Sequence, residues 1–289
     1  MSSAVRSSLW SSQPRPDPML ETLSALLRAI AYAAALTGSG IVLAGVTLRV
    51  ERSASMGFVQ GISRWAGAAL ALAALLSAGV YGLRLGAGLD LTMLSAIFCS
   101  PLGTALALQC IAGACLASGP RRRVAAFAAM LILLSFANSG HAPSRSPVAA
   151  AAIYLHVSAA AWWIGAICIL RATSPVMPPT HFLELLHRFS TQALLAVASL
   201  VIAGSIVAAY LLRLDPDLAR PYDRLLLFKL GLASALIALA AINKWVLTPA
   251  LTESTSALPM LQRSMAMELV LFAAVAATTA ALTTYLSPH

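Results

Sequence analysis

Charged residues are scarce in this chain: only 10% of its 289 residues are Asp, Glu, Lys or Arg, whereas 60% are apolar. Long polar stretches are missing too, because the connections between the apolar segments are short. This shortage excludes a separate soluble domain of ordinary size. The sequence therefore predicts a protein that folds in a lipid bilayer, where its apolar side chains meet hydrocarbon instead of water.

Three kinds of motif are absent as well. The four cysteines contain no CxxC pair, which argues against a disulfide framework. No P-loop occurs, so pumping driven by nucleotide hydrolysis is not expected, and nothing else in the sequence indicates an enzyme. The first twenty residues are rich in Ser and Pro and lack the apolar core of a signal peptide, so we expect a flexible tail over residues 1–20.

The apolar residues gather in about eight segments, most of which have the ~20 residues that a helix needs to cross ~30 Å of hydrocarbon. These segments lack the alternating pattern of a barrel strand. The sequence therefore predicts an all-α fold, a polytopic membrane helix bundle with about eight transmembrane helices in a single domain over residues 21–289. The predicted spans are Thr22–Leu48, Phe58–Leu83, Pro101–Ser118, Val124–Asn138, Val148–Leu170, Phe189–Leu212, Leu225–Leu247 and Ser264–Leu286.

Proline and small residues predict how the helices run and pack. No proline lies inside a predicted span, so we expect mostly unbroken helices whose ends or connections are marked by Pro101, Pro120, Pro147, Pro179, Pro221 and Pro249. Small residues four positions apart let helix backbones approach closely. Three such pairs are candidate seams: Gly40 with Ala44, Ala161 with Gly165, and Ser199 with Ala203.

The net charge of +9 comes from basic residues at the ends of the apolar segments, which indicates membrane orientation and no nucleic-acid partner. The odd-numbered connections and their flanks hold nine Lys or Arg residues, including the triplet Arg121–Arg123, against seven in the N-terminal segment and the even-numbered connections. Cytoplasmic connections carry the excess of positive charge. We therefore expect odd connections in the cytoplasm and both termini in the periplasm.

His156 lies in the body of the fifth predicted span, ~12 Å below its outer edge and close to the ~15 Å midplane, counting from Val148. No lipid group can satisfy a neutral imidazole at this depth. The ring therefore hydrogen-bonds a neighbouring helix, binds a metal or haem, or transfers a proton.

His141 follows the unusually short fourth span, ~25 Å from the cytoplasmic edge when counted from Val124. The two histidines would then differ by ~7 Å in depth, and the short connection Pro143–Pro147 favours adjacent helices. Two imidazoles can reach one ion across such a gap. His141 and His156 are accordingly the candidate metal ligands.

Imidazole binds copper, zinc, iron or nickel, whereas thioether and thiolate favour Cu(I). The soft groups available, Met93, Met130, Cys99 and Cys168, are expected to pack in the core rather than bind metal. His181 and His187 fall in the fifth connection and are expected to be solvated, although an exit site for the metal is an alternative.

Two charged residues inside spans leave alternatives open. Arg64 and Glu268 lie at similar depths on the expected cytoplasmic side, so they form an ion pair. Alternatively, Arg64 extends its side chain to the membrane surface and Glu268 meets Arg263 or Lys244 there. Trp162 and Trp163 lie too deep for the interfacial aromatic belt, and packing explains both.

The chain resembles the copper resistance protein D (CopD) family of bacterial inner-membrane proteins from about Phe58 to its C-terminus. The order and spacing of short motifs carry this resemblance. They are Ser139-Gly140-His141-Ala142, Leu155-His156, Ala160-Ala161-Trp162-Trp163-Ile164-Gly165, His187-Arg188-Phe189-Ser190, Pro221-Tyr222-Asp223-Arg224-Leu225-Leu226-Leu227-Phe228-Lys229, Ala241-Ile242-Asn243-Lys244 and Met267-Glu268-Leu269.

The resemblance implies an eight-helix inner-membrane protein that serves copper uptake or copper tolerance. It also implies a copper ion at His141 and His156, and a periplasmic copper-binding protein as partner. We expect copper to pass from the periplasm to the cytoplasm.

Two other classes of function remain open at this stage. A membrane cytochrome or quinone-linked oxidoreductase would use intramembrane histidines to bind haem, and a Soret band in the absorption spectrum would favour it. An assembly or scaffold protein would use His156 only to hydrogen-bond a neighbouring helix. A deletion strain with unchanged cellular copper would point to the scaffold.

Overall fold

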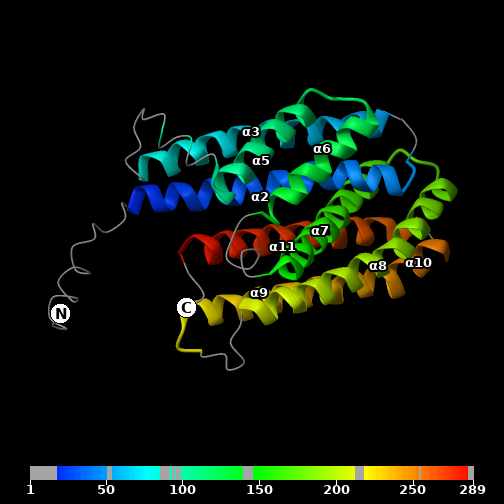
Figure 1. Ribbon diagram of the computed structural model, residues 1–289. Coiled ribbons are helices and arrows are strands. Elements are labelled where there is room, and N and C mark those ends of the chain that lie inside the picture. Colours follow the sequence, from blue (N-terminus) through cyan, green and yellow to red (C-terminus); the bar gives the residue numbers. More distant parts are fainter. Residues whose placement is uncertain are drawn as a thin grey trace, which may run out of the picture.

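The computed structural model describes residues 18–50, 54–84, 92, 95, 99–138, 146–211, 218–253 and 255–285, and all regular structure in these ranges is helical (Figure 1). The predicted all-α class is confirmed for this part of the chain. The elements are α2 (Pro18–Thr47), α3 (Ala54–Arg84), α5 (Pro101–Ala117), α6 (Arg122–Ser135), α7 (Pro147–Thr173), α8 (Pro179–Leu211), α9 (Pro221–Ile242), the π-helix η2 (Asn243–Leu247), α10 (Thr248–Glu253), the 3₁₀ turn η3 (Thr255–Ala257) and α11 (Leu258–Tyr285).

Six helical stretches among the described residues are long and apolar enough to cross a membrane, so the expected count of eight is not confirmed. These stretches are α2, α3, α7, α8, α9 continued through α10, and α11. The other two, α5 and α6, have 17 and 14 residues. At ~1.5 Å per residue they are ~26 and ~21 Å long, which is shorter than the ~30 Å hydrocarbon layer.

Most helices begin at a proline, as predicted. Pro101, Pro147 and Pro221 each occupy the first turn of a helix, where the missing N–H would have no partner in any case. The Ser100 hydroxyl caps α5 by accepting a hydrogen bond from the Gly103 N–H at 3.1 Å, and the Ser146 hydroxyl caps α7 in the same way. These local signals explain why helix starts can be read from the sequence.

Pro249 differs from this pattern, because it lies inside a continuous helical stretch from Pro221 to Glu253. Pro249 has no N–H, so the carbonyl one turn earlier loses its usual partner. The chain widens into the π-helix η2 directly before it, and the Thr248 N–H donates to the Asn243 carbonyl five residues back. The prediction that Pro249 marks the end of a helix is therefore wrong.

Helix α2 is central to the bundle and packs against α3, α6, α7 and α11. Its first half lies beside the end of α11, where the hydroxyls of Tyr32 and Thr283 are 3.3 Å apart. Figure 1 accordingly shows α2 beginning and α11 ending at the same end of the bundle. Both described ends of the chain therefore lie on one side.

The closest helix contact joins α2 to α7 through two of the predicted seams. A Cβ atom on Gly40 would lie 1.9 Å from the Ala161 carbonyl oxygen, and one on Gly165 would lie 2.0 Å from the Gly40 carbonyl carbon. The two backbones thus touch without intervening side chains. Ala44, one turn after Gly40, is fully buried. The small-residue pairs of α2 and α7 are therefore confirmed as packing seams.

Arginine side chains from other helices cap the end of α2. Arg122 of α6 donates to the carbonyls of Gly45 and Val46 at 3.0 and 2.9 Å, and Arg188 of α8 donates to the Leu48 carbonyl at 3.0 Å. These carbonyls have no partner within the helix, and cations stabilise a helix C-terminus. We call this side, where α2 ends and α6 and α8 begin, the basic end of the bundle.

Candidate functional site

His156 of α7 is fixed by a carbonyl of the neighbouring helix α8. Its Nδ1 atom lies 3.1 Å from the Leu200 carbonyl oxygen. Because a carbonyl can only accept, Nδ1 carries the hydrogen and donates it, and Nε2 keeps its lone pair. Histidines that bind metals are typically oriented in this way, with the other ring nitrogen donating to a carbonyl or carboxylate.

Gly204 makes room for the His156 ring on α8. A Cβ atom at this position would lie 3.2 Å from both Cε1 and Nδ1 of the imidazole. Gly204 is one helical turn beyond Leu200, so carbonyl and glycine lie on the same side of α8. Together they form a close-fitting seat for the ring.

Helix α9 contributes a charged residue, Lys229, to the surroundings of His156. The positive charge of Lys229 acts electrostatically on the imidazole. Lys229 in its ammonium form would repel a metal cation bound at Nε2 in the low-dielectric interior. The described residues therefore give His156 the right hydrogen bond for a metal ligand, and Lys229 in its charged form would oppose binding of a cation there.

The second predicted ligand, His141, lies outside the described residues, as does Met93. Within the described ranges, no group of three or more His, Cys, Asp or Glu side chains could hold a metal ion. Cys99 is exposed, and Met130 is 50% exposed on α6. Cys168 is twelve residues from His156 on α7, ~18 Å along the axis. Among the described residues, His156 therefore does not belong to a group of His, Cys, Asp or Glu side chains that could hold a metal ion.

His181 and His187 belong to the first turns of α8 rather than to a loop, and both are exposed. They precede Leu200 by 19 and 13 residues, which is ~28 and ~20 Å along the helix. Neither can share a metal or haem with His156 in this arrangement.

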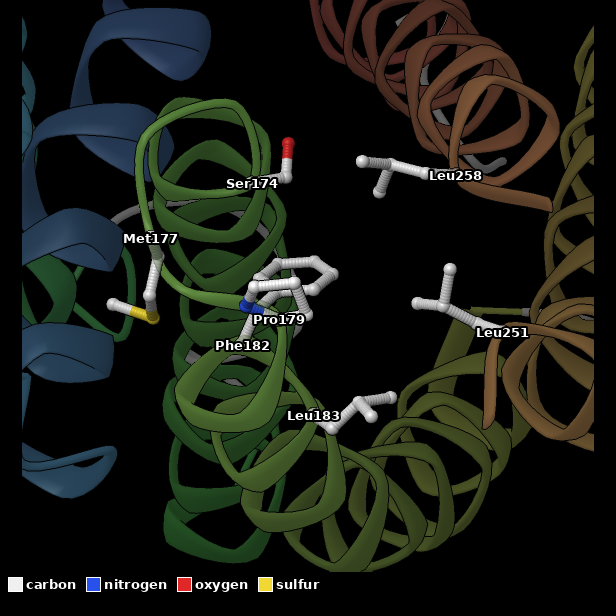
Figure 2. A pocket seen from close by; sticks show the side chains of 7 residues that line it. All are labelled: Ser174, Met177, Pro179, Phe182, Leu183, Leu251 and Leu258. Carbon is white, nitrogen blue, oxygen red and sulfur yellow. The ribbon is translucent and has the colours of Figure 1, made fainter. Parts of the chain in front are cut away.

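A cavity of about 50 Å³ lies at the basic end, between the start of α8 and the α10–α11 segment. Figure 2 shows Leu183, Leu251 and Leu258 pointing into the gap from the two sides. Its polar lining is Ser174, whose hydroxyl accepts a hydrogen bond from Gln262 at 2.9 Å. An apolar cavity of this size lacks the donor set of a metal site.

Part of the chain matches a known protein family. Residues 183–282 match the CopD family, copper resistance protein D. The resemblance predicted from the motifs is thus confirmed for the region from α8 to α11. Comparison with curated proteins and with solved structures found no match.

The CopD match covers part of the His156 site and leaves part of it out. It includes Leu200 and Gly204, which contact the ring, and Lys229, which acts on it electrostatically. It excludes His156 itself and His141. The match therefore supports a copper-related membrane protein, and the role of the two histidines stays a prediction.

Glu268 and Asn243 of the CopD region form a polar cluster with Trp163 of α7 that sequence spacing did not predict. The Glu268 carboxylate of α11 is only 3% exposed and accepts a hydrogen bond from the Trp163 indole N–H at 2.9 Å. The side-chain amide of Asn243 in η2 donates to its other oxygen. Of the two alternatives for Arg64 and Glu268, the ion pair is wrong, because Arg64 donates instead to the Ala117 carbonyl at 3.1 Å.

The tryptophans of α7 also have polar roles beyond packing. Trp163 packs edge-on against Phe272, with ring centroids 5.5 Å apart, while its N–H reaches Glu268. Trp162 donates to the Thr47 hydroxyl at 2.7 Å. The sequence indicated this cluster only through Glu268, a carboxylate within an apolar segment. Its hydrogen-bond donors come from two other helices, so spacing along one helix cannot identify them.

Proposed function

We propose that this protein moves copper across the bacterial inner membrane, from the periplasm to the cytoplasm, with the ion held by His141 and His156. The CopD match over residues 183–282 carries the assignment to copper. Six long apolar helices support a multi-pass membrane protein. The hydrogen bond from His156 Nδ1 to the Leu200 carbonyl supports the ligand role, because it leaves Nε2 available.

The length of the connection before α7 allows His141 to take part. His156 is nine residues into α7 from Pro147, ~14 Å along the axis. His141 precedes Pro147 by six residues, and an extended chain of that length reaches up to ~20 Å. A connection folded back along α7 can therefore bring the second imidazole to Nε2 of the first.

The positive charge of Lys229 is compatible with a site that binds copper and then releases it. A neighbouring positive charge lowers the affinity of a bound cation. A transported ion must bind well enough to enter and weakly enough to leave. We propose that Lys229 keeps copper at His156 transient.

The expected orientation fits the same proposal. Arg122 and Arg188 lie at the basic end, which we assign to the cytoplasm. The opposite side, where α2 begins and α11 ends, then faces the periplasm and accepts copper from a separate periplasmic copper-binding protein. In this arrangement α5 and α6 complete eight crossings.

The test is copper binding to purified protein in detergent, with Cu(I) kept reduced and with Cu(II), for the parent chain and its histidine variants. We expect His156→Ala and His141→Ala each to weaken binding, and the double variant to lose the bound ion. His181→Ala, on the exposed start of α8, is the matched control and should bind as the parent does. A folded double variant that binds as much copper as the parent would exclude these two ligands.

A further inference from the structure

Glu268 is a buried carboxyl that has no role in the proposed copper site. It is 3% exposed, lies in a span, and receives hydrogen bonds from α7 and η2 through Trp163 and Asn243. No described lysine or arginine forms a salt bridge with it. Burying a charged carboxylate without a neighbouring cation costs free energy, so the charge state of Glu268 requires an explanation.

The charged and titratable groups on the helices packed against α11 lie away from Glu268. Lys244, next to Asn243, directs its ammonium group to the Ser190 carbonyl of α8 at 3.5 Å. Arg263 is exposed, and Arg28 of α2 donates to the Thr283 carbonyl near the far end of α11. On α2, Tyr32 contacts Thr283 near the same far end, and Glu21 lies in the first turn. The remaining groups are separated along their helices from Trp163 or Asn243: Cys168, His156, Arg171 and Tyr154 by five, seven, eight and nine residues on α7, and Lys229, Arg224, Asp223 and Tyr222 by fourteen, nineteen, twenty and twenty-one on α9.

Two unpaired oxygens accompany the carboxylate. The side-chain oxygen of Asn243 and the hydroxyl of Ser264 are buried and have no hydrogen-bond partner. Asn243 already contacts Glu268 through its amide nitrogen, and Ser264 lies one helical turn before Glu268 on the same side of α11. Both side chains are less than 9% exposed. Unsatisfied buried acceptors are costly, and an O–H donor at the carboxyl could relieve that cost.

We propose that Glu268, held by Trp163 and Asn243, is a proton-binding site in the interior of the membrane domain. A proton neutralises the carboxylate and gives it one O–H, which can donate to an unpaired acceptor such as the side-chain oxygen of Asn243. A metal ion fits less well, since the described residues offer no group of three His, Cys, Asp or Glu ligands there. The π-helix at Asn243 adds a helical irregularity of a kind frequent at functional sites.

This site lies close to the proposed copper site along one helix. Trp163 and His156 are seven residues apart on α7, ~10 Å along the axis and on the same side. A change in the hydrogen bond to Trp163 therefore acts on the helix that carries His156. Coupling between the proton and copper rests on the proposed function, whereas proton binding itself does not.

The experiment uses the full chain in liposomes without copper, so its failure is distinct from failure of the copper proposal. The readout is the infrared carbonyl stretch of a protonated carboxyl, followed as pH is raised. We expect a band that disappears with deprotonation in the parent, is missing in Glu268→Gln, and is retained in the control Glu184→Gln. Glu184 is an exposed glutamate on α8.

Trp163→Phe keeps the aromatic packing and removes one donor to the carboxylate, so it should shift the midpoint of the band without abolishing it. Glu268→Gln preserves the shape of the side chain, and its fold is checked by the unchanged helical signal in circular dichroism. A titrating band that survives in folded Glu268→Gln, or a parent without such a band at any pH, would overturn the proposal.

Discussion

At the scale of single residues, the orientation of His156 depends on a glycine in the neighbouring helix. The Gly204→Ala substitution would place a Cβ atom 3.2 Å from Cε1 and Nδ1 of the ring. The ring must turn out of its preferred position, at a cost of about 1 kcal/mol. We expect copper affinity to fall roughly fivefold, because 1.4 kcal/mol corresponds to a factor of ten. The measurement is a copper titration of the purified variant.

The matched control is Gly79→Ala, since a Cβ atom on Gly79 of α3 meets nothing within 4 Å. It should bind copper as the parent does. Unchanged affinity in Gly204→Ala would mean that the seat of the ring on α8 is irrelevant to metal binding.

Depth within a predicted span explains which functional residues could be recognised from the sequence. His156 and Glu268 were recognisable because a polar side chain within an apolar span needs a partner. Their partners, Leu200 on α8 and Trp163 with Asn243, were not recognisable, because these contacts join residues 44, 105 and 25 positions apart. Such contacts depend on which helices become neighbours, and that information lies outside any local pattern.

At the scale of the elements, the contact between α2 and α7 depends on two glycines. The Gly40→Ala substitution would place a Cβ atom 1.9 Å from the Ala161 carbonyl oxygen, so the two backbones must separate. Overpacking of this kind costs about 3 kcal/mol. We expect a clear loss of thermal stability in detergent, measured by circular dichroism, and the same for Gly165→Ala.

Gly61→Ala on α3 is the control for this pair, because its Cβ atom meets nothing within 4 Å. It should unfold at or slightly above the temperature of the parent, since alanine favours the helix over glycine. An equally stable Gly40→Ala protein would contradict the close approach of α2 and α7.

The starts of the helices were more predictable from the sequence than their lengths. Proline and serine act locally at a helix start, so Pro101, Pro147 and Pro221 were correctly assigned. Pro249 was not, because a membrane helix tolerates proline by widening into a π-turn. The apolar segments before and after Gly119 both form helices, yet at 17 and 14 residues neither reaches the length of a full span.

At the scale of the whole molecule, the alternation of the predicted spans anticipated how the bundle is arranged. Arg122 and Arg188 belong to different odd-numbered connections in the sequence, and the structure brings them to one end of α2. The ends of α2 and α11 that face the other way lie together. The alternation of the spans therefore predicted which connections share a side, and the arginine count was used only to assign that side to the cytoplasm. The membrane itself is needed to say which side is cytoplasmic.

Orientation and the number of crossings can be tested together with single cysteines in a variant lacking the four native ones. Ser118→Cys lies between α5 and α6, Val176→Cys between α7 and α8, and Leu218→Cys between α8 and α9, and all three positions are exposed. A thiol reagent that cannot cross the membrane should label Leu218→Cys in spheroplasts, and label the other two only after permeabilisation. Labelling of Ser118→Cys from outside, with Val176→Cys protected, would mean that α5 and α6 do not cross. Labelling of Val176→Cys from outside would reverse the orientation, and with it the proposed direction in which copper meets His156.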